Sequence, residues 1–157
     1  QMCIRDRDIT GSSMTAETNT DIPSLGASKG DRLPNTVEKQ YNIGLTYEYS
    51  SPLMGLASFV RADYLYYGDS FATFEQSESM FSPDYTKINV NWGMEIDANN
   101  SIQLSIDNLT DERTEAFKYS VNSPSWRPRD YMQWIPPRTI TFAYLSLIHI
   151  SEPTRRS

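Results

Sequence analysis

The sequence contains almost none of the side chains on which catalysis and metal binding most often depend. Its 157 residues include one cysteine, Cys3, and one histidine, His149. An internal disulfide needs two cysteines, and a Ser-His active site or a His-rich metal centre needs histidine within the fold. We therefore expect no enzyme activity, no catalytic residues, no metal and no cofactor.

Long hydrophobic runs and an excess of positive charge are also missing. There is no run of about 18 apolar residues and the mean hydropathy is −0.55, which excludes a transmembrane helix. The chain has 14 Lys and Arg against 20 Asp and Glu, a net charge of −6, so no nucleic-acid partner is expected. A transmembrane β-barrel stays open, because each of its strands gives a much weaker signal than a helix.

The two ends of the sequence do not look native. Residues 1–9 and 146–157 resemble translated sequencing-adapter DNA, and we predict that both are non-native scars, to be set aside before the fold is considered. Residues 1–8 are charged and lack the apolar centre of a secretory signal. If the protein is exported, its natural N-terminus is therefore expected to be missing.

The sequence does contain alternation between apolar and polar residues, which is the pattern of a β-strand with one apolar and one polar face. It appears in residues 39–50, residues 56–67, both arms of a hairpin at 87–107 whose turn is 98–100, and residues 138–144. The apolar row of the hairpin is Ile88, Val90, Trp92, Met94, Ile96, Ile102, Leu104 and Ile106. Charged residues on the polar rows are Arg61, Asp63, Lys87, Glu95 and Asp107.

Strand and loop lengths favour a membrane barrel over a soluble β-sandwich. Four of the strands reach about 9–12 residues, against a mode of about 5–6 in globular proteins, and a tilted strand crosses a bilayer in about 9–11. Short turns at 51–55 and 98–100 alternate with long loops at 10–37, 68–84 and 111–137. Tyrosines gather near the strand ends, as in the aromatic girdles of outer-membrane barrels.

These patterns predict an all-β fold: a fragment of an antiparallel transmembrane β-barrel with about five long strands in meander order, over residues 38–145. The apolar row is predicted to face lipid and the charged row to face a wet lumen, because mid-strand charges would be costly in a sealed core. Such a lumen implies a wide barrel, which five strands cannot close. Most of the wall is expected to lie outside this chain.

Four segments, taken in order and spacing, resemble a known family. They are GDRLPNTVEKQYNIGLTYEY (30–49), FVRADYLYYGD (59–69), YTKINVNWGMEIDANNSIQLSIDNLTDER (85–113) and PPRTITFAY (136–144). Residues 33–36 resemble an LPNxP lead-in, with Val37 where proline is common, and residues 108–111 resemble the NLFD or NLTD exit from a penultimate strand. In these features the chain resembles the C-terminal end of a TonB-dependent receptor, although the tail replaces the usual terminal aromatic residue.

The resemblance implies a barrel of 22 strands in the outer membrane of a Gram-negative bacterium, closed by an N-terminal plug domain. Such receptors take up scarce ligands, including ferric siderophores, with force from TonB. The chain resembles only the last five strands, so the plug domain, the TonB contact and the other strands are expected in an absent part of the parent chain. The long loops are then extracellular and are expected to contact the small-molecule ligand.

The last long loop contains the candidate ligand-binding residues. Two arginines lie among aromatic residues there: Trp126, Arg127, Arg129, Tyr131 and Trp134. Charge and cation–π contacts suit an anionic aromatic ligand such as a catecholate siderophore. The alternative is that the aromatic rings pack the loop and the arginines are solvated. Asp107, Asp111 and Glu112 lie at or just before the start of this loop. No glycine stands at the turning position that a calcium-binding loop needs, so we interpret these acidic residues as the entrance to the loop and not as a calcium site.

Two other functions stay open at this stage. One is a passive outer-membrane porin, which a plug domain upstream in the parent gene would argue against. The other is a soluble, secreted, glycan-binding β-sandwich, which extraction without detergent would favour.

Overall fold

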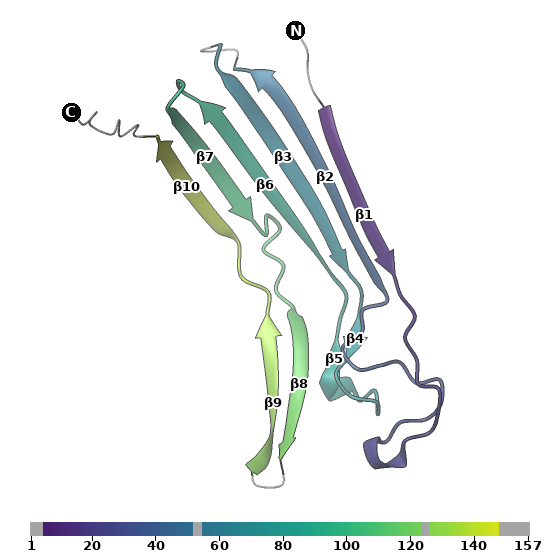
Figure 1. Cartoon of the computed structure of the whole chain (residues 1–157). Helices are drawn as coiled ribbons and strands as arrows, with labels where there is room; N and C mark the ends of the chain where they lie inside the picture. The colour runs from purple at the N-terminus through teal and green to yellow at the C-terminus, as the bar shows by residue number, and fades with distance from the viewer. Residues whose placement is uncertain (1–4, 52–54, 124–125, 148–157) are drawn as a thin grey trace, which may run out of the picture.

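The computed structural model describes residues 5–51, 55–123 and 126–147, and its main element is a six-stranded antiparallel sheet (Figure 1). In spatial order the strands are β1 (Arg5–Ser13), β2 (Lys39–Ser50), β3 (Ala57–Tyr67), β6 (Tyr85–Glu95), β7 (Asn100–Asp107) and β10 (Thr139–Ser146). Each strand pairs with the next strand of this sheet along the chain, which is a meander. The predicted fold class, an antiparallel barrel fragment, is confirmed.

The remaining elements belong to the long connections and lie at one end of the sheet (Figure 1). Two two-stranded ribbons pair β4 (Ser70–Phe71) with β5 (Phe81–Ser82) and β8 (Glu115–Ser123) with β9 (Trp126–Trp134). Two 3-10 helices, η1 (Pro23–Leu25) and η2 (Glu78–Met80), complete the fold. Within the described ranges, no helix has the length and apolar character needed to span a bilayer.

Three details differ from the prediction. All five predicted strands are present, but β1 is a sixth strand, paired with β2 from Arg5↔Tyr47 to Ser13↔Lys39. The strand therefore takes in residues 10–13, predicted as loop, and residues 5–9, predicted as part of a scar; the origin of residues 1–9 stays a prediction. The sequence of β1 gives a weak signal, because Ile9 is its only large apolar residue.

The second difference is that the loop at 111–137 is not irregular, since it contains the β8–β9 ribbon. The third is Ile96, predicted to continue the apolar row of its strand. It follows the end of β6 and lies in the turn, where its N–H donates to the carbonyl oxygen of Asn100 at 2.8 Å.

The strand register collects the other residues of the apolar row on one face of the sheet. On β6 and β7 the pairs are Val90↔Ile106, Trp92↔Leu104 and Met94↔Ile102. On β3 and β6 the pairs Tyr64↔Ile88, Ala62↔Val90 and Val60↔Trp92 extend the same face. Because opposite residues in an antiparallel pair project to the same side, these side chains form one continuous apolar surface. We call it the apolar face.

No second layer of the described chain covers the apolar face. Leu45 is 51% exposed, Ile140 66% and Phe142 67%. The buried apolar residues of the described ranges are Ala27, Met80 and Ile135, and none of them belongs to the six-stranded sheet. The sheet is also open, with β1 and β10 at its two edges (Figure 1). Within the described ranges, the apolar face is therefore not packed against a second sheet.

Aromatic side chains mark both ends of the apolar face. Near the long connections, the rings of Tyr41 and Tyr66 stack with centroids 5.7 Å apart. Near the short turns, the indole N–H of Trp92 donates to the hydroxyl of Tyr49 at 3.0 Å. Tyr41 and Tyr49 are separated by about 27 Å along β2, at about 3.4 Å per residue. The apolar middle is thus bracketed by rings with polar tips, over a length similar to a barrel's apolar band of about 25 Å.

Candidate functional site

The opposite face of the sheet is polar, and its centre is an ion-pair cluster around Arg61. The guanidinium of Arg61 donates to both carboxylate oxygens of Asp63, at 3.0 and 2.6 Å, and to Asp8 on β1 at 3.1 Å. It also donates to the hydroxyl of Thr46 at 3.2 Å. The side chain of Arg61 is 33% exposed, so this cluster links β1, β2 and β3 at a solvated surface.

The register places all five charged residues predicted for the polar row on this polar face. Asp63 lies opposite Asn89, and Lys87 lies opposite Leu65, next along the same row. Glu95 ends β6 and Asp107 ends β7. That this row faces a lumen stays a prediction.

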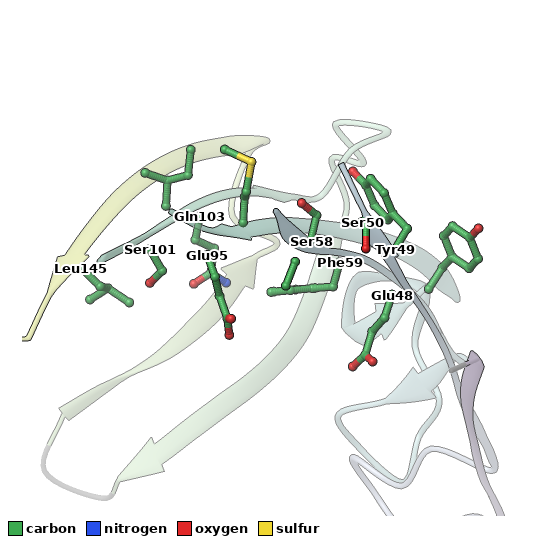
Figure 2. A pocket seen from close by; sticks show the side chains of 13 residues that line it. Glu48, Tyr49, Ser50, Ser58, Phe59, Glu95, Ser101, Gln103 and Leu145 are labelled. Atoms are coloured by element: carbon green, nitrogen blue, oxygen red, sulfur yellow. The ribbon is translucent and has the colours of Figure 1, made fainter. Parts of the chain in front are cut away.

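A hollow of about 760 Å³ lies at the short-turn end of the sheet (Figure 2). Figure 2 shows Glu48 and Glu95 pointing to the same side, with Phe59 between them. The lining contains these two carboxylates and no Lys, Arg or His. It is therefore poorly suited to an anionic ligand.

At the opposite end of the sheet, Arg32 joins two of the long connections. Its guanidinium pairs with Glu38 at 3.1 Å and with Asp69, from the β3–β4 junction, at 3.0 Å. It also donates to the carbonyl oxygens of Thr36 and Asp69 and lies 5.9 Å from the centroid of the Phe71 ring. These contacts tie residues 14–38 to residues 68–84 at the base of both loops.

The β8–β9 ribbon at this end presents a row of exposed rings. Tyr119 and Tyr131 are directly opposite in register, and their rings stack with centroids 4.9 Å apart and an angle of 9°. Phe117 continues the row at 5.8 Å from Tyr119. The three side chains are between 38% and 41% exposed. We call this surface, formed by Phe117, Tyr119 and Tyr131, the aromatic face of the hairpin.

The other face of the ribbon contacts the rest of the chain. Lys118 pairs with Glu115 and donates to the carbonyl oxygen of Ser79, in η2, at 3.2 Å. Because side chains alternate along a strand, the neighbours Phe117 and Tyr119 project to the opposite side, away from this contact. The aromatic face is therefore left open to solvent.

The structure brings only some of the predicted ligand-binding residues together. Arg129 and Tyr131, two residues apart on β9, share a face, and both are exposed. Trp134 is 55% exposed but follows the alternation of Met132, so it projects to the other face. The side chains of Trp126 and Arg127 lie outside the part of the chain that is described. Phe117 and Tyr119 were not predicted, although their period-two spacing in the sequence was a usable signal. That Tyr131 is the cross-strand partner of Tyr119 follows only from the register.

A compact turn at residues 108–111 forms the base of the hairpin. Asp111 accepts hydrogen bonds from the backbone N–H of Arg138 at 3.0 Å and from the Arg113 guanidinium at 2.9 Å. The Arg138 N–H first, and Arg113 second, hold the pKa of Asp111 below its usual range. These contacts of Asp111 agree with its interpretation as part of the loop entrance. The described residues contain no group of three or more His, Cys, Asp or Glu suited to a metal ion.

A family model described as "TonB dependent receptor-like, beta-barrel" matches residues 8–109, about two thirds of the chain. The chain belongs to this family. No curated protein matches it.

Membership of the receptor-barrel family agrees with the antiparallel meander, because the matched residues run from β1 to the turn after β7 and include five of the six strands of the sheet. They include Asp8, which the register and the ion pair with Arg61 make part of the sheet. The matched range ends at Leu109, so the β8–β9 hairpin, with its aromatic face, lies beyond it. This is a family of receptors rather than of enzymes.

Proposed function

We propose that the chain is part of the wall of an outer-membrane receptor that takes up a scarce small-molecule ligand with force from TonB. The apolar face meets outer-membrane lipid, and the polar face lines the lumen. The plug domain, the other strands and the contact with TonB belong to the parent chain. The observation that carries this proposal is an uncovered apolar face of bilayer length in a chain of the receptor-barrel family.

The solvent on each face follows from the cost of the alternatives. Leaving a large apolar side chain in water rather than in an apolar medium costs about 1.5–3 kcal/mol, and the apolar face carries many such residues. Arg61, Asp63, Lys87, Glu95 and Asp107 would in turn cost several kcal/mol each in hydrocarbon. Both costs are avoided when the apolar face contacts lipid and the polar face contacts water.

For the ligand, we propose an iron complex of a catecholate siderophore, held at the hairpin. The stacked rings of the aromatic face offer a flat apolar surface, and Arg129 adds a positive charge on the same side of β9. A planar anion with aromatic rings complements both features. Trp126 and Arg127 belong to the same proposal as further contacts from the hairpin, whereas Trp134 projects to the other face of β9 and is left out of this surface.

Uptake in living cells tests this function. The full-length receptor is expressed in an iron-limited Gram-negative strain that lacks its own siderophore receptors, with and without TonB. Uptake of a radiolabelled ferric catecholate should require both the receptor and TonB, whereas a ferric hydroxamate, without aromatic rings, should not be taken up. Uptake that persists without TonB would favour a passive porin, and release of the receptor without detergent would favour a soluble protein.

Two neighbouring substitutions test the ligand surface. Tyr131→Ala removes one of the two stacked rings and should weaken binding of the ferric catecholate about fivefold, the loss expected for one aromatic contact. Met132→Ala, on the other face of the same strand, is the matched control and should bind normally. Equal effects of the two substitutions would contradict the proposed surface.

A further inference from the structure

Asn108 is buried more completely than any other large side chain in the described ranges. It is 1% exposed, although it is polar and lies at the end of β7 in a sheet that has almost no core. Ile135, 7% exposed, lies at the other end of the hairpin sequence, and its N–H donates to the carbonyl oxygen of Thr114 at 3.1 Å. The best-buried part of this region is therefore the neck of the β8–β9 hairpin.

The Asn108 carboxamide connects both arms of that neck. Its Oδ1 accepts the N–H of Glu112 at 2.9 Å, and its Nδ2 donates to the carbonyl oxygens of Glu112 at 3.0 Å and Pro136 at 2.9 Å. Glu112 precedes β8 and Pro136 follows β9. One side chain thus bonds to the segment that enters the hairpin and to the segment that leaves it.

The backbone of the same residue is attached to the sheet. The N–H of Asn108 donates to the Asn89 side chain on β6 at 3.0 Å, and the N–H of Leu109 donates to the carbonyl oxygen of Ile88 at 2.8 Å. Asn108 has a φ of 53°, a left-handed conformation that asparagine tolerates better than most residues. This conformation turns the chain out of β7 while the side chain stays beneath the neck.

We infer that Asn108 is a positioning residue that sets the direction in which the hairpin, and with it the aromatic face, projects from the sheet. The hairpin is joined to the sheet by two single segments, 108–114 and 135–138. The two segments also bond to each other through the Ile135 N–H to Thr114 and the Arg138 N–H to Asp111. The Asn108 carboxamide adds the buried link, which ties both segments to the end of β7. An amide is required there because one group must accept one bond and donate two.

The consequence for ligand binding rests on the proposed function, whereas the orientation of the hairpin does not. A recognition surface that is already ordered before binding has a smaller entropic cost of binding, because it does not need to be ordered by the ligand. Loss of the link should therefore loosen the hairpin whether or not the hairpin binds a ferric catecholate.

Distance measurements between spin labels test the orientation directly. In the full-length receptor in lipid vesicles, with native cysteines replaced by serine, labels at Asp130→Cys and Thr141→Cys report the hairpin relative to β10. Asn108→Ala removes all three side-chain bonds, and Asn108→Asp replaces the two donations by carboxylate–carbonyl repulsion. Both should broaden the distance distribution, whereas Asn99→Asp, the same change in the exposed turn at the far end of the sheet, should leave it narrow.

A narrow, wild-type distribution in both Asn108 variants would overturn the inference. A second measurement covers the case in which these variants fail to fold. In the unsubstituted receptor, the amide of Glu112 should exchange at least about fivefold more slowly than that of Arg113, because one hydrogen bond to a buried acceptor is worth about 1 kcal/mol or more. Rapid exchange at Glu112 would show that the link does not persist, and would also overturn the inference.

Binding of the ferric catecholate separates this role from the proposed function. Asn108→Ala should weaken binding as well as broaden the distances if both hold. Broadened distances, with binding unaffected by both Asn108→Ala and Tyr131→Ala, would support the positioning role and reject the hairpin as the ligand surface.

Discussion

At two positions of the sheet, glycine makes room for a side chain from another strand. At Gly93 on β6, a Cβ would overlap the Phe59 ring, which lies over the strand from its partner β3. At Gly44 on β2, a Cβ would meet the ends of Arg61 and Asp8 where they form their ion pair. The two cases differ physically, because an aromatic ring moves as a rigid body and the end of an arginine is flexible.

Gly93→Ala should therefore destabilise the barrel by about 1 kcal/mol, through loss of the ring's packing across the strand. Gly44→Ala, the control, should cost less, since Arg61 and Asp8 can shift into the solvated face. The free energy of unfolding in urea, measured on the full-length receptor in vesicles, checks both. The double variant Gly93→Ala with Phe59→Ala should be no less stable than Phe59→Ala alone; additive losses would contradict the overlap.

Asp111 predicts a pH dependence at the base of the hairpin. Its pKa is lowered in the folded state by the Arg138 N–H and by Arg113. A lowered folded-state pKa means that the stabilisation is fully present above the unfolded-state pKa of about 3.9 and is lost as pH falls below it. Exchange of the Arg138 amide, corrected for its intrinsic rate, should therefore accelerate on acidification from about pH 5 to pH 3.

Asp111→Asn is the matched variant for this pH dependence. It retains an oxygen that can accept the Arg138 N–H but has no carboxylate to protonate. The corrected exchange rate in this variant should be independent of pH over the same range. A pH dependence equal to that of the unsubstituted protein would assign the titration to another group.

At the scale of the strand, the proposed function places adjacent residues in different solvents, lipid and water. Leu104 on β7 lies opposite Trp92 and Phe142 on the apolar face, and Ser105 projects to the polar face. Leu104→Lys should cost about 2–4 kcal/mol, the cost of a lysine on the lipid side of a barrel near the midplane. Ser105→Lys, one residue away, should cost little. Urea unfolding in vesicles distinguishes them, and comparable losses would argue against lipid on the apolar face.

The elements also differ in how well the sequence predicted them. Strands β2, β3, β6, β7 and β10 have clear period-two alternation, and all were predicted. Strand β1 and the ribbon β8–β9 were not predicted. The alternation of β1 and β9 is weak or mixed, whereas the period-two pattern of β8 was present but was not recognised. The partners of these strands depend on the register and not on local sequence. Within the candidate site, Arg129 and Tyr131 were predicted and share a face, whereas the cross-strand stack with Tyr119 emerges only from the register.

At the scale of the whole molecule, the open edges of β1 and β10 predict how the isolated chain behaves. Six strands leave two rows of unpaired backbone groups, and a bilayer offers no water to satisfy them. The 157-residue chain alone should therefore not form a closed barrel. On gels it should lack the heat-modifiable migration of a closed barrel, and a faster band in the unboiled sample would contradict this prediction.

The sequence by itself determined which residues share a face and where most strands begin and turn. Those properties follow from the two-residue repeat of an extended chain, which is local. Only the tertiary structure decided that residues 5–13 complete the sheet, that Tyr119 stacks on Tyr131 and that Asn108 joins the two arms of the hairpin neck. Each of these joins residues distant along the chain, and hydrogen bonds and ring contacts across such distances arise only when the strands have found their register.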